Sequence, residues 1–215
     1  MNINNIFIFD DQIENWNFDL SETEGIAETT RPGTLKTRLD AILYRTYSDG
    51  TSKWADYVPP IATTGLETAT NIFTKINPNA TVKECHQVIW HTYYTWSLQE
   101  KLDIHRDYPP INGYTCLFMV HGSGPLNFYH SLFDDEPALS VDFKPNRFII
   151  FPCHYWHRAC SPVNDVRMSL GMMFTVENLI EELNNVHAEC MCGLSKDPKN
   201  LCDGSHSSIL RKNQY

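Results

Sequence analysis

The feature that most restricts the fold is a run of short strand-like segments between residues 82 and 175. In the first of them, Val82–Trp96, apolar and polar side chains alternate, which predicts Trp90 on one face of a strand and His91 on the other. Further strands are expected over residues 115–120, 126–130, 138–143, 147–151, 157–160 and 166–175. About seven strands with a turn roughly every 8–15 residues predict an antiparallel sandwich or barrel.

The segments before and after this run are less regular. We expect a short strand over residues 5–9, a helix over 35–46 with Thr34 as its N-cap, a helix from Thr63 or Thr64 to Asn77, and a helix over 177–186. The predicted fold class is mainly β with flanking helices, a double-stranded β-helix (jelly roll, cupin-like). The expected domains are residues 1–186, the jelly roll with its N-terminal helical and strand elements, and residues 187–215, a small metal-binding segment.

Composition is that of an ordinary soluble globular protein, with 42% hydrophobic and 20% charged residues. No run reaches the roughly 18 apolar residues of a membrane helix. The first ten residues lack the basic region and cleavage site of a signal peptide, so a cytoplasmic location is expected. Seven cysteines, an odd and clustered set, favour metal ligation over disulfides. Four of them lie in strand-like stretches and are expected to be buried thiols: Cys85, Cys116, Cys153 and Cys160.

The net charge of −9 is concentrated at one end of the chain. The first 30 residues hold seven acidic residues and no Lys or Arg, and the rest is nearly balanced. No basic stripe of the kind that binds a phosphate backbone is present in the sequence. We therefore expect neither a nucleic acid nor a membrane as partner, but a small-molecule or peptidyl substrate.

A set of metal-ligand residue types is distributed across the strand-rich region. His105 and Asp107 are two residues apart, so in an extended stretch their side chains project the same way. His157 follows a later strand, and two imidazoles with one carboxylate make an open three-point iron site. His154 could replace His157 as the distal ligand, but the ten-residue spacing to Arg167 favours His157.

This pattern resembles that of the Fe(II)/2-oxoglutarate-dependent oxygenases, the prolyl-hydroxylase-like superfamily, from about Trp96 to Thr175. The resemblance implies that His105, Asp107 and His157 bind Fe(II) and form the catalytic centre. It implies that Arg167, helped by Ser169, binds the distal carboxylate of the co-substrate 2-oxoglutarate, a contact that suits a guanidinium fork. Halogenating members of the family have a small residue where Asp107 stands, so hydroxylation or a related oxidation is expected.

One motif is misleading. His105-Arg106-Asp107 and Asn112 fit the catalytic-loop pattern of protein kinases. The chain has neither a Gly-rich phosphate loop nor an Asp-Phe-Gly sequence, and two prolines interrupt the motif. We reject the kinase interpretation.

The C-terminal segment carries a second set of ligand residue types: Cys190, Cys192, Cys202 and His206. Thiolates select zinc or iron–sulfur clusters. The segment resembles the CDGSH iron–sulfur family, which implies a [2Fe–2S] cluster and a homodimer. It departs from the family pattern because nine residues, not eight, separate the second and third cysteines, and Pro198 is displaced. A structural zinc site and a tail without metal remain as alternatives.

Three functions are compatible with these motifs. The first is an enzyme, an Fe(II)/2-oxoglutarate-dependent dioxygenase that hydroxylates a small molecule or a peptidyl side chain and releases succinate and CO2. The second is an iron–sulfur redox or iron-sensing protein on a catalytically silent cupin scaffold. The third is a metal-binding cupin without either activity, for instance a zinc protein. The sequence does not identify the oxidised substrate.

Overall fold

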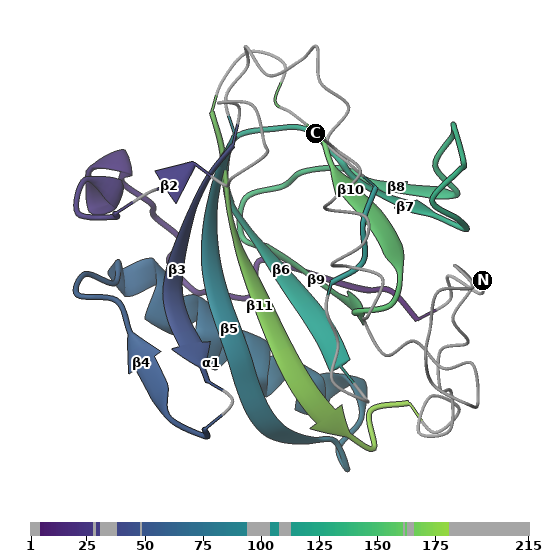
Figure 1. Cartoon of the computed structure of the whole chain (residues 1–215), viewed down its shortest axis with the longest axis horizontal. Helices are drawn as coiled ribbons and strands as arrows, with labels where there is room; N and C mark the ends of the chain where they lie inside the picture. Colours follow the sequence, from purple (N-terminus) through teal and green to yellow (C-terminus); the bar gives the residue numbers. More distant parts are fainter. Residues whose placement is uncertain are drawn as a thin grey trace. The chain divides into compact units, whose positions relative to one another are not determined.

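The computed structural model describes residues 5–27, 29–30, 38–47, 49–93, 104–107, 113–160, 162 and 166–180. The chain divides into two units, Met1–Leu179 and Ile180–Tyr215, and the architecture given below is that of the first. Over its described residues the chain forms eleven strands, one α-helix and one short 3-10 helix, η1 (Leu20–Thr23) (Figure 1). None of the helices in this described part is long and apolar enough to cross a membrane.

Eight strands form a large antiparallel sheet with the order β1-β9-β6-β11-β5-β3-β2, and β4 pairs with β3 beside this path. Their bounds are β1 Phe7–Asp10, β2 Thr29–Thr30, β3 Arg38–Thr46, β4 Ser52–Trp54, β5 Thr81–Tyr93, β6 Gly113–His121, β9 Arg147–Pro152 and β11 Arg167–Glu177. The long strands β5 and β11 pair along their whole length near the middle of the sheet. Of these two strands, β11 carries Arg167 and Ser169.

Three shorter strands form a second sheet with the order β10-β7-β8. They are β7 (Leu126–Tyr129), β8 (Leu139–Val141) and β10 (Trp156–Ala159). A buried apolar cluster draws its side chains from both sheets: Leu117, Met119, Leu126, Phe128, Val141, Ile149, Phe151 and Tyr155. Two sheets that face each other across such a cluster make the jelly-roll, cupin-like β-sandwich expected from the strand pattern.

The opposite face of the large sheet is covered by the helix α1 (Pro60–Ile76), which lies behind β5 and β11 in Figure 1. Pro60 occupies the first turn, where its missing N–H costs nothing. Phe73 packs edge-on against Phe174 of β11 and Tyr114 of β6. The side chains on the helix-facing side of the large sheet are thus buried under α1. Those on the opposite face, called the inner face from here on, line the space between the two sheets.

Most strands of the run from residue 82 to residue 175 lie within two residues of their expected bounds, but two helix predictions need comment. The helix predicted over 35–46 is wrong, because Arg38–Thr46 forms strand β3. There Ala41 and Leu43 are buried while Ile42 is exposed, a period of two that pairing with β5 and β4 imposes. The helix predicted from Glu177 also fails at its first residue, which ends β11, and residues 181–186 lie outside the described residues.

Of the four cysteines expected to be buried thiols, two are. Cys116 and Cys153 are fully buried, whereas Cys85 and Cys160 are half-buried. Burial raises the pKa of the Cys85 thiol to about 12 and that of Cys116 further still. Neutral thiols of this kind behave as small apolar side chains.

Candidate metal centre

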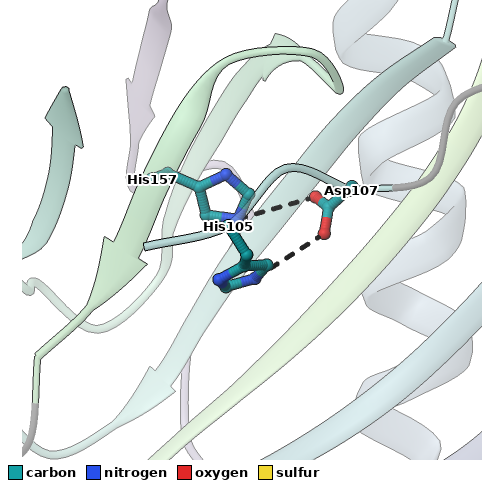
Figure 2. A group of neighbouring side chains, drawn as sticks. All are labelled: His105, Asp107 and His157. Atoms are coloured by element: carbon teal, nitrogen blue, oxygen red, sulfur yellow. Dashed lines mark ion pairs between the residues drawn. The ribbon is translucent and has the colours of Figure 1, made fainter. Parts of the chain in front are cut away.

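The structure brings His105, Asp107 and His157 together, with one ligand atom from each lying within 4.8 Å of the others. Nε2 of His157 is 3.6 Å from Oδ2 of Asp107, and Nε2 of His105 is 3.9 Å from Oδ1 (Figure 2). The two imidazole rings have centroids 4.4 Å apart. Three protein ligand atoms that converge in this way would leave further coordination positions of a metal open to exogenous ligands.

Backbone hydrogen bonds fix the short stretch that carries His105 and Asp107. The N–H of His105 donates to the carbonyl oxygen of His157 over 3.0 Å, and the N–H of His157 donates back over 2.9 Å. The N–H of Asp107 donates to the carbonyl oxygen of Cys153 over 3.1 Å. His105 thereby extends the small sheet beyond β10 as an isolated bridge. Both ends of the His-x-Asp pair are held against the chain segment that carries His157.

The residue between the two ligand positions points elsewhere. The guanidinium of Arg106 lies over the ring of Trp156, 4.1 Å from its centroid. An extended backbone sends successive side chains to opposite sides, so Arg106 is excluded from the group that His105 and Asp107 enter. The cation–π contact adds a stabilising interaction that holds this orientation.

The orientation of His157 is set by its own chain. Its side chain is buried, and Nδ1 lies 3.0 Å from the carbonyl oxygen of Tyr155. A carbonyl can only accept, so Nδ1 donates to it, and Nε2 is the ring nitrogen left on the Asp107 side to ligate a metal. A histidine that ligates a metal through one nitrogen needs this kind of support at the other.

Asp107 is held in its charged form. Burial by itself would raise the pKa of its carboxyl group, but the neighbouring His157 and His105 and a hydrogen bond from the hydroxyl of Thr115 hold it below its ordinary value. Thr115 is 4% exposed, and its Oγ1 also lies 3.3 Å from Sγ of Cys153. Thr115 could not be identified from the sequence, since a threonine within a strand carries no signal of such a contact.

Of the two candidate distal histidines, His157 is the one that joins the group. His154 packs edge-on against Tyr155, with ring centroids 5.0 Å apart. Burial and the nearby charge of Arg106 lower the pKa of His154 to about 4. His154 therefore stays a neutral, packed side chain beside the turn between β9 and β10.

Arg167 is fully buried on β11, so its guanidinium lies inside the fold and not at the surface. Its Nη1 donates to the carbonyl oxygens of Gly124, Pro125 and Cys160, over 2.9, 3.0 and 2.8 Å. The rings of Tyr93 and Phe143 flank the guanidinium at 5.5 and 5.3 Å. Carbonyl groups carry no net charge, so these three contacts do not neutralise the guanidinium.

Ser169 follows two residues later on the same face of β11. Its Oγ is buried and has no hydrogen-bond partner among the described residues. Buried hydroxyls are rarely left in this state. A carboxylate bound next to Arg167 would satisfy this hydroxyl, and two imidazoles with one carboxylate suit Fe(II). The residues present thus fit both the metal and the 2-oxo acid that the sequence pattern implies.

The second predicted site cannot be placed in the fold. Its ligands, Cys190, Cys192, Cys202 and His206, all lie outside the described residues.

Comparison with known proteins supports the fold. No family model matches the chain, and no curated protein does either. Among solved structures, an oxidoreductase of the 2OG-Fe(II) oxygenase family from Burkholderia pseudomallei is similar at 12% identity with a TM-score of 0.51, over 72% of this chain and 74% of that one. A bsmA homologue from Methylobium petroleophilum PM1 gives 11% identity and a TM-score of 0.44, over 72% and 78% of the two chains.

Proposed function

We propose that this chain is a non-haem Fe(II)- and 2-oxoglutarate-dependent dioxygenase. One observation carries the proposal: the same jelly roll holds both a His-Asp-His group and a buried Arg-x-Ser pair. The fold similarity to a 2OG-Fe(II) oxygenase family oxidoreductase supports it. When bound, the metal supplies the redox chemistry by which dioxygen oxidises 2-oxoglutarate to succinate and CO2 and hydroxylates a substrate.

Each side chain has a distinct part in this proposal. His105, Asp107 and His157 hold Fe(II), and Asp107 offsets one of its two positive charges. Arg167 and Ser169 bind the far carboxylate of 2-oxoglutarate and thereby orient its 2-oxo end toward the metal. Asp107 fills the position that a halide would need, so the expected outcome is hydroxylation or a related oxidation.

The substrate proposed is a small molecule or a peptidyl side chain. Outside its acidic first 30 residues the chain is nearly balanced in charge, which disfavours a nucleic-acid substrate. The ring of Phe151 packs edge-on against that of His157, with centroids 4.9 Å apart, so the group has an apolar neighbour on that side.

The decisive test is 2-oxoglutarate turnover. Purified protein with Fe(II), 2-oxoglutarate and dioxygen should release succinate, and His157→Ala and Arg167→Ala should each abolish this release. His86→Ala is the matched control, because His86 lies on β5 and contacts Thr175 rather than the group. Succinate release that survives both substitutions would remove the proposal.

A second function rests on the C-terminal ligand set of Cys190, Cys192, Cys202 and His206. We propose that these residues bind a [2Fe–2S] cluster, with zinc as the alternative, in a chain that forms a homodimer. If the jelly roll is catalytically silent, the protein would act in electron transfer or iron sensing. That case predicts a reducible visible chromophore, lost in Cys202→Ser, with no succinate release. Zinc at both sites on metal analysis would instead indicate a metal-binding cupin without either activity.

A further inference from the structure

A largely buried ionisable pair connects β5 to β3. The proposed function gives this pair no role. Nδ1 of His91 lies 2.7 Å from Oδ1 of Asp40, and the two side chains are only 9% and 14% exposed. The two residues are direct partners in the β3–β5 register. A buried ion pair costs desolvation energy that an apolar pair of similar size would avoid. A role beyond packing would account for such a pair in the large sheet.

The register of the sheet places His91 beside the proposed co-substrate site. His91 lies directly opposite Ser169 of β11, so its side chain shares the inner face with Ser169 and Arg167. Tyr93, two residues further along β5, is opposite Arg167 and contacts its guanidinium. His91 is therefore level with Ser169 and one step along the wall from Arg167.

The other end of this wall belongs to the metal group. Thr115, which donates to Asp107, lies opposite Met173, four residues beyond Ser169 on β11. His91 is also near enough to Asp107 to contribute to the lowering of its pKa. His91 thus lies, in position along β11, between Arg167 and the metal group.

Gly171 makes room for the imidazole ring. A Cβ at this position would lie 2.7 Å from Nε2 of His91, well inside contact distance. The ring is held at Nδ1 by Asp40 and so has little freedom to move aside. Nε2 is consequently turned away from β3 toward β11, over the one inner position of this stretch that has no side chain.

Resting on the proposed function, we propose that His91 binds the metal-proximal 2-oxo-carboxylate end of 2-oxoglutarate through Nε2, and that Asp40 is its positioning residue. Arg167 and Ser169 take the far carboxylate, and the two methylene groups between the ends offer no acceptor. A protonated imidazole donates from both nitrogens, one to Asp40 and one to the ligand. Asp40 supplies the counter-charge that keeps such a ring stable when buried.

The test measures ligand binding by the full chain loaded with Mn²⁺, which needs no turnover. In His91→Asn the amide replaces Nδ1 and can still reach Asp40, but nothing replaces Nε2. In His91→Gln the amide reaches the position of Nε2. His91→Asn should weaken 2-oxoglutarate binding about 10-fold or more, the loss expected for one hydrogen bond to a charged group. His91→Gln should recover most of that loss, and Mn²⁺ affinity should stay the same in both.

Two further measurements distinguish ligand binding by His91 from a purely structural role. Oxalate resembles only the metal-proximal end of the co-substrate, and its affinity should fall in His91→Asn as that of 2-oxoglutarate does. Gly171→Ala removes no polar group but displaces the ring, and it should weaken both ligands. His86→Asn, a histidine substitution elsewhere on β5, should change neither affinity.

The outcomes are distinguishable. A wild-type chain that binds Mn²⁺ and 2-oxoglutarate, with unchanged affinities for 2-oxoglutarate and oxalate in His91→Asn and Gly171→Ala, overturns this inference and leaves the proposed function intact. Loss of 2-oxoglutarate affinity without loss of oxalate affinity also overturns it, since the contact would then be at the far end. A wild-type chain that binds neither Mn²⁺ nor 2-oxoglutarate overturns both.

Discussion

The hydroxyl of Thr115 donates a hydrogen bond to Oδ2 of Asp107, from the inner face of β6 to the carboxylate of the candidate metal group. The same carboxylate faces Nε2 of His157 and of His105, at 3.6 and 3.9 Å. The hydroxyl thus restricts rotation of the carboxylate while leaving it in contact with both imidazoles. Partners of this kind orient metal ligands and tune their affinity.

Thr115→Val, which keeps the shape of the side chain and removes the hydroxyl, should lower Mn²⁺ or Fe(II) affinity roughly 10- to 100-fold. Thr115→Ser should retain most of the affinity because the donor remains. Calorimetric titration of the metal under anaerobic conditions measures both. Thr70→Val is the control, since its hydroxyl donates only to Leu66 within α1. Equal affinities for the valine and serine variants would show that the hydroxyl does not position the carboxylate.

Arg167→Lys should raise the dissociation constant of 2-oxoglutarate at least about 10-fold, because an ammonium lacks the planar fork that binds a carboxylate in two places. The change also removes donors from the carbonyls of Gly124, Pro125 and Cys160, so stability should fall by about 1–3 kcal/mol. Ligand titration and urea denaturation separate the two effects. Arg45→Lys, at an exposed position of β3, should change neither. Unaltered co-substrate affinity would argue against the role of Arg167.

The strands that carry the candidate site were predictable because their side-chain pattern is local. Alternation along β5 placed His91 and Trp90 on opposite faces, and the structure has Trp90 fully buried on the helix side of the sheet. The strand β3 was missed for the opposite reason. Its register with β5 is a contact between residues about fifty positions apart, and this pairing decides the structure of Arg38–Thr46.

The same contrast between local patterns and long-range contacts applies to the site residues. Spacing alone drew attention to His105, Asp107 and His157, because metal ligands are a restricted set of residue types. Thr115 and Asp40 belong to residue types found throughout any chain, and only the folded sheet brings them to Asp107 and His91. A sequence pattern can therefore indicate which residues hold a metal, but not which residues orient them.

Close packing between α1 and the large sheet gives a stability prediction. A Cβ on Gly65 would lie 2.9 Å from Cδ1 of Phe118. That ring cannot easily move, because it stacks on Phe148 at 4.3 Å and meets Trp16 edge-on at 5.5 Å. Alanine improves helix propensity by about 1 kcal/mol over glycine, whereas overpacking costs about 1–3 kcal/mol. Gly65→Ala should therefore destabilise the fold by about 1 kcal/mol in urea denaturation, while Glu67→Ala on the exposed face of α1 should not. A higher stability of Gly65→Ala would show that the ring of Phe118 moves aside for the added methyl group.

The edge strand β1 is attached to β9 by an ion pair whose pH dependence has a defined sign. Nε and Nη2 of Arg147 donate to the two carboxylate oxygens of Asp10 over 2.6 and 2.9 Å. These bonds, with help from Lys144, hold the pKa of Asp10 below its ordinary value of 3.8. A lowered pKa stabilises the fold above pH 3.8, and the contribution is lost as the pH falls through the lowered value. Asp10→Asn should thus lower the melting temperature at pH 7, by an amount equivalent to less than about 1 kcal/mol for a partly exposed pair.

The same difference should shrink as the pH falls below 3.8, where the wild-type carboxylate becomes protonated and loses its attraction to Arg147. Thermal denaturation of both proteins from pH 3 to pH 7 measures the trend. The control is Asp135→Asn at an exposed position between β7 and β8. A difference between wild type and Asp10→Asn that stays constant over this range would mean that hydrogen-bond geometry, and not charge, attaches β1 to the sheet.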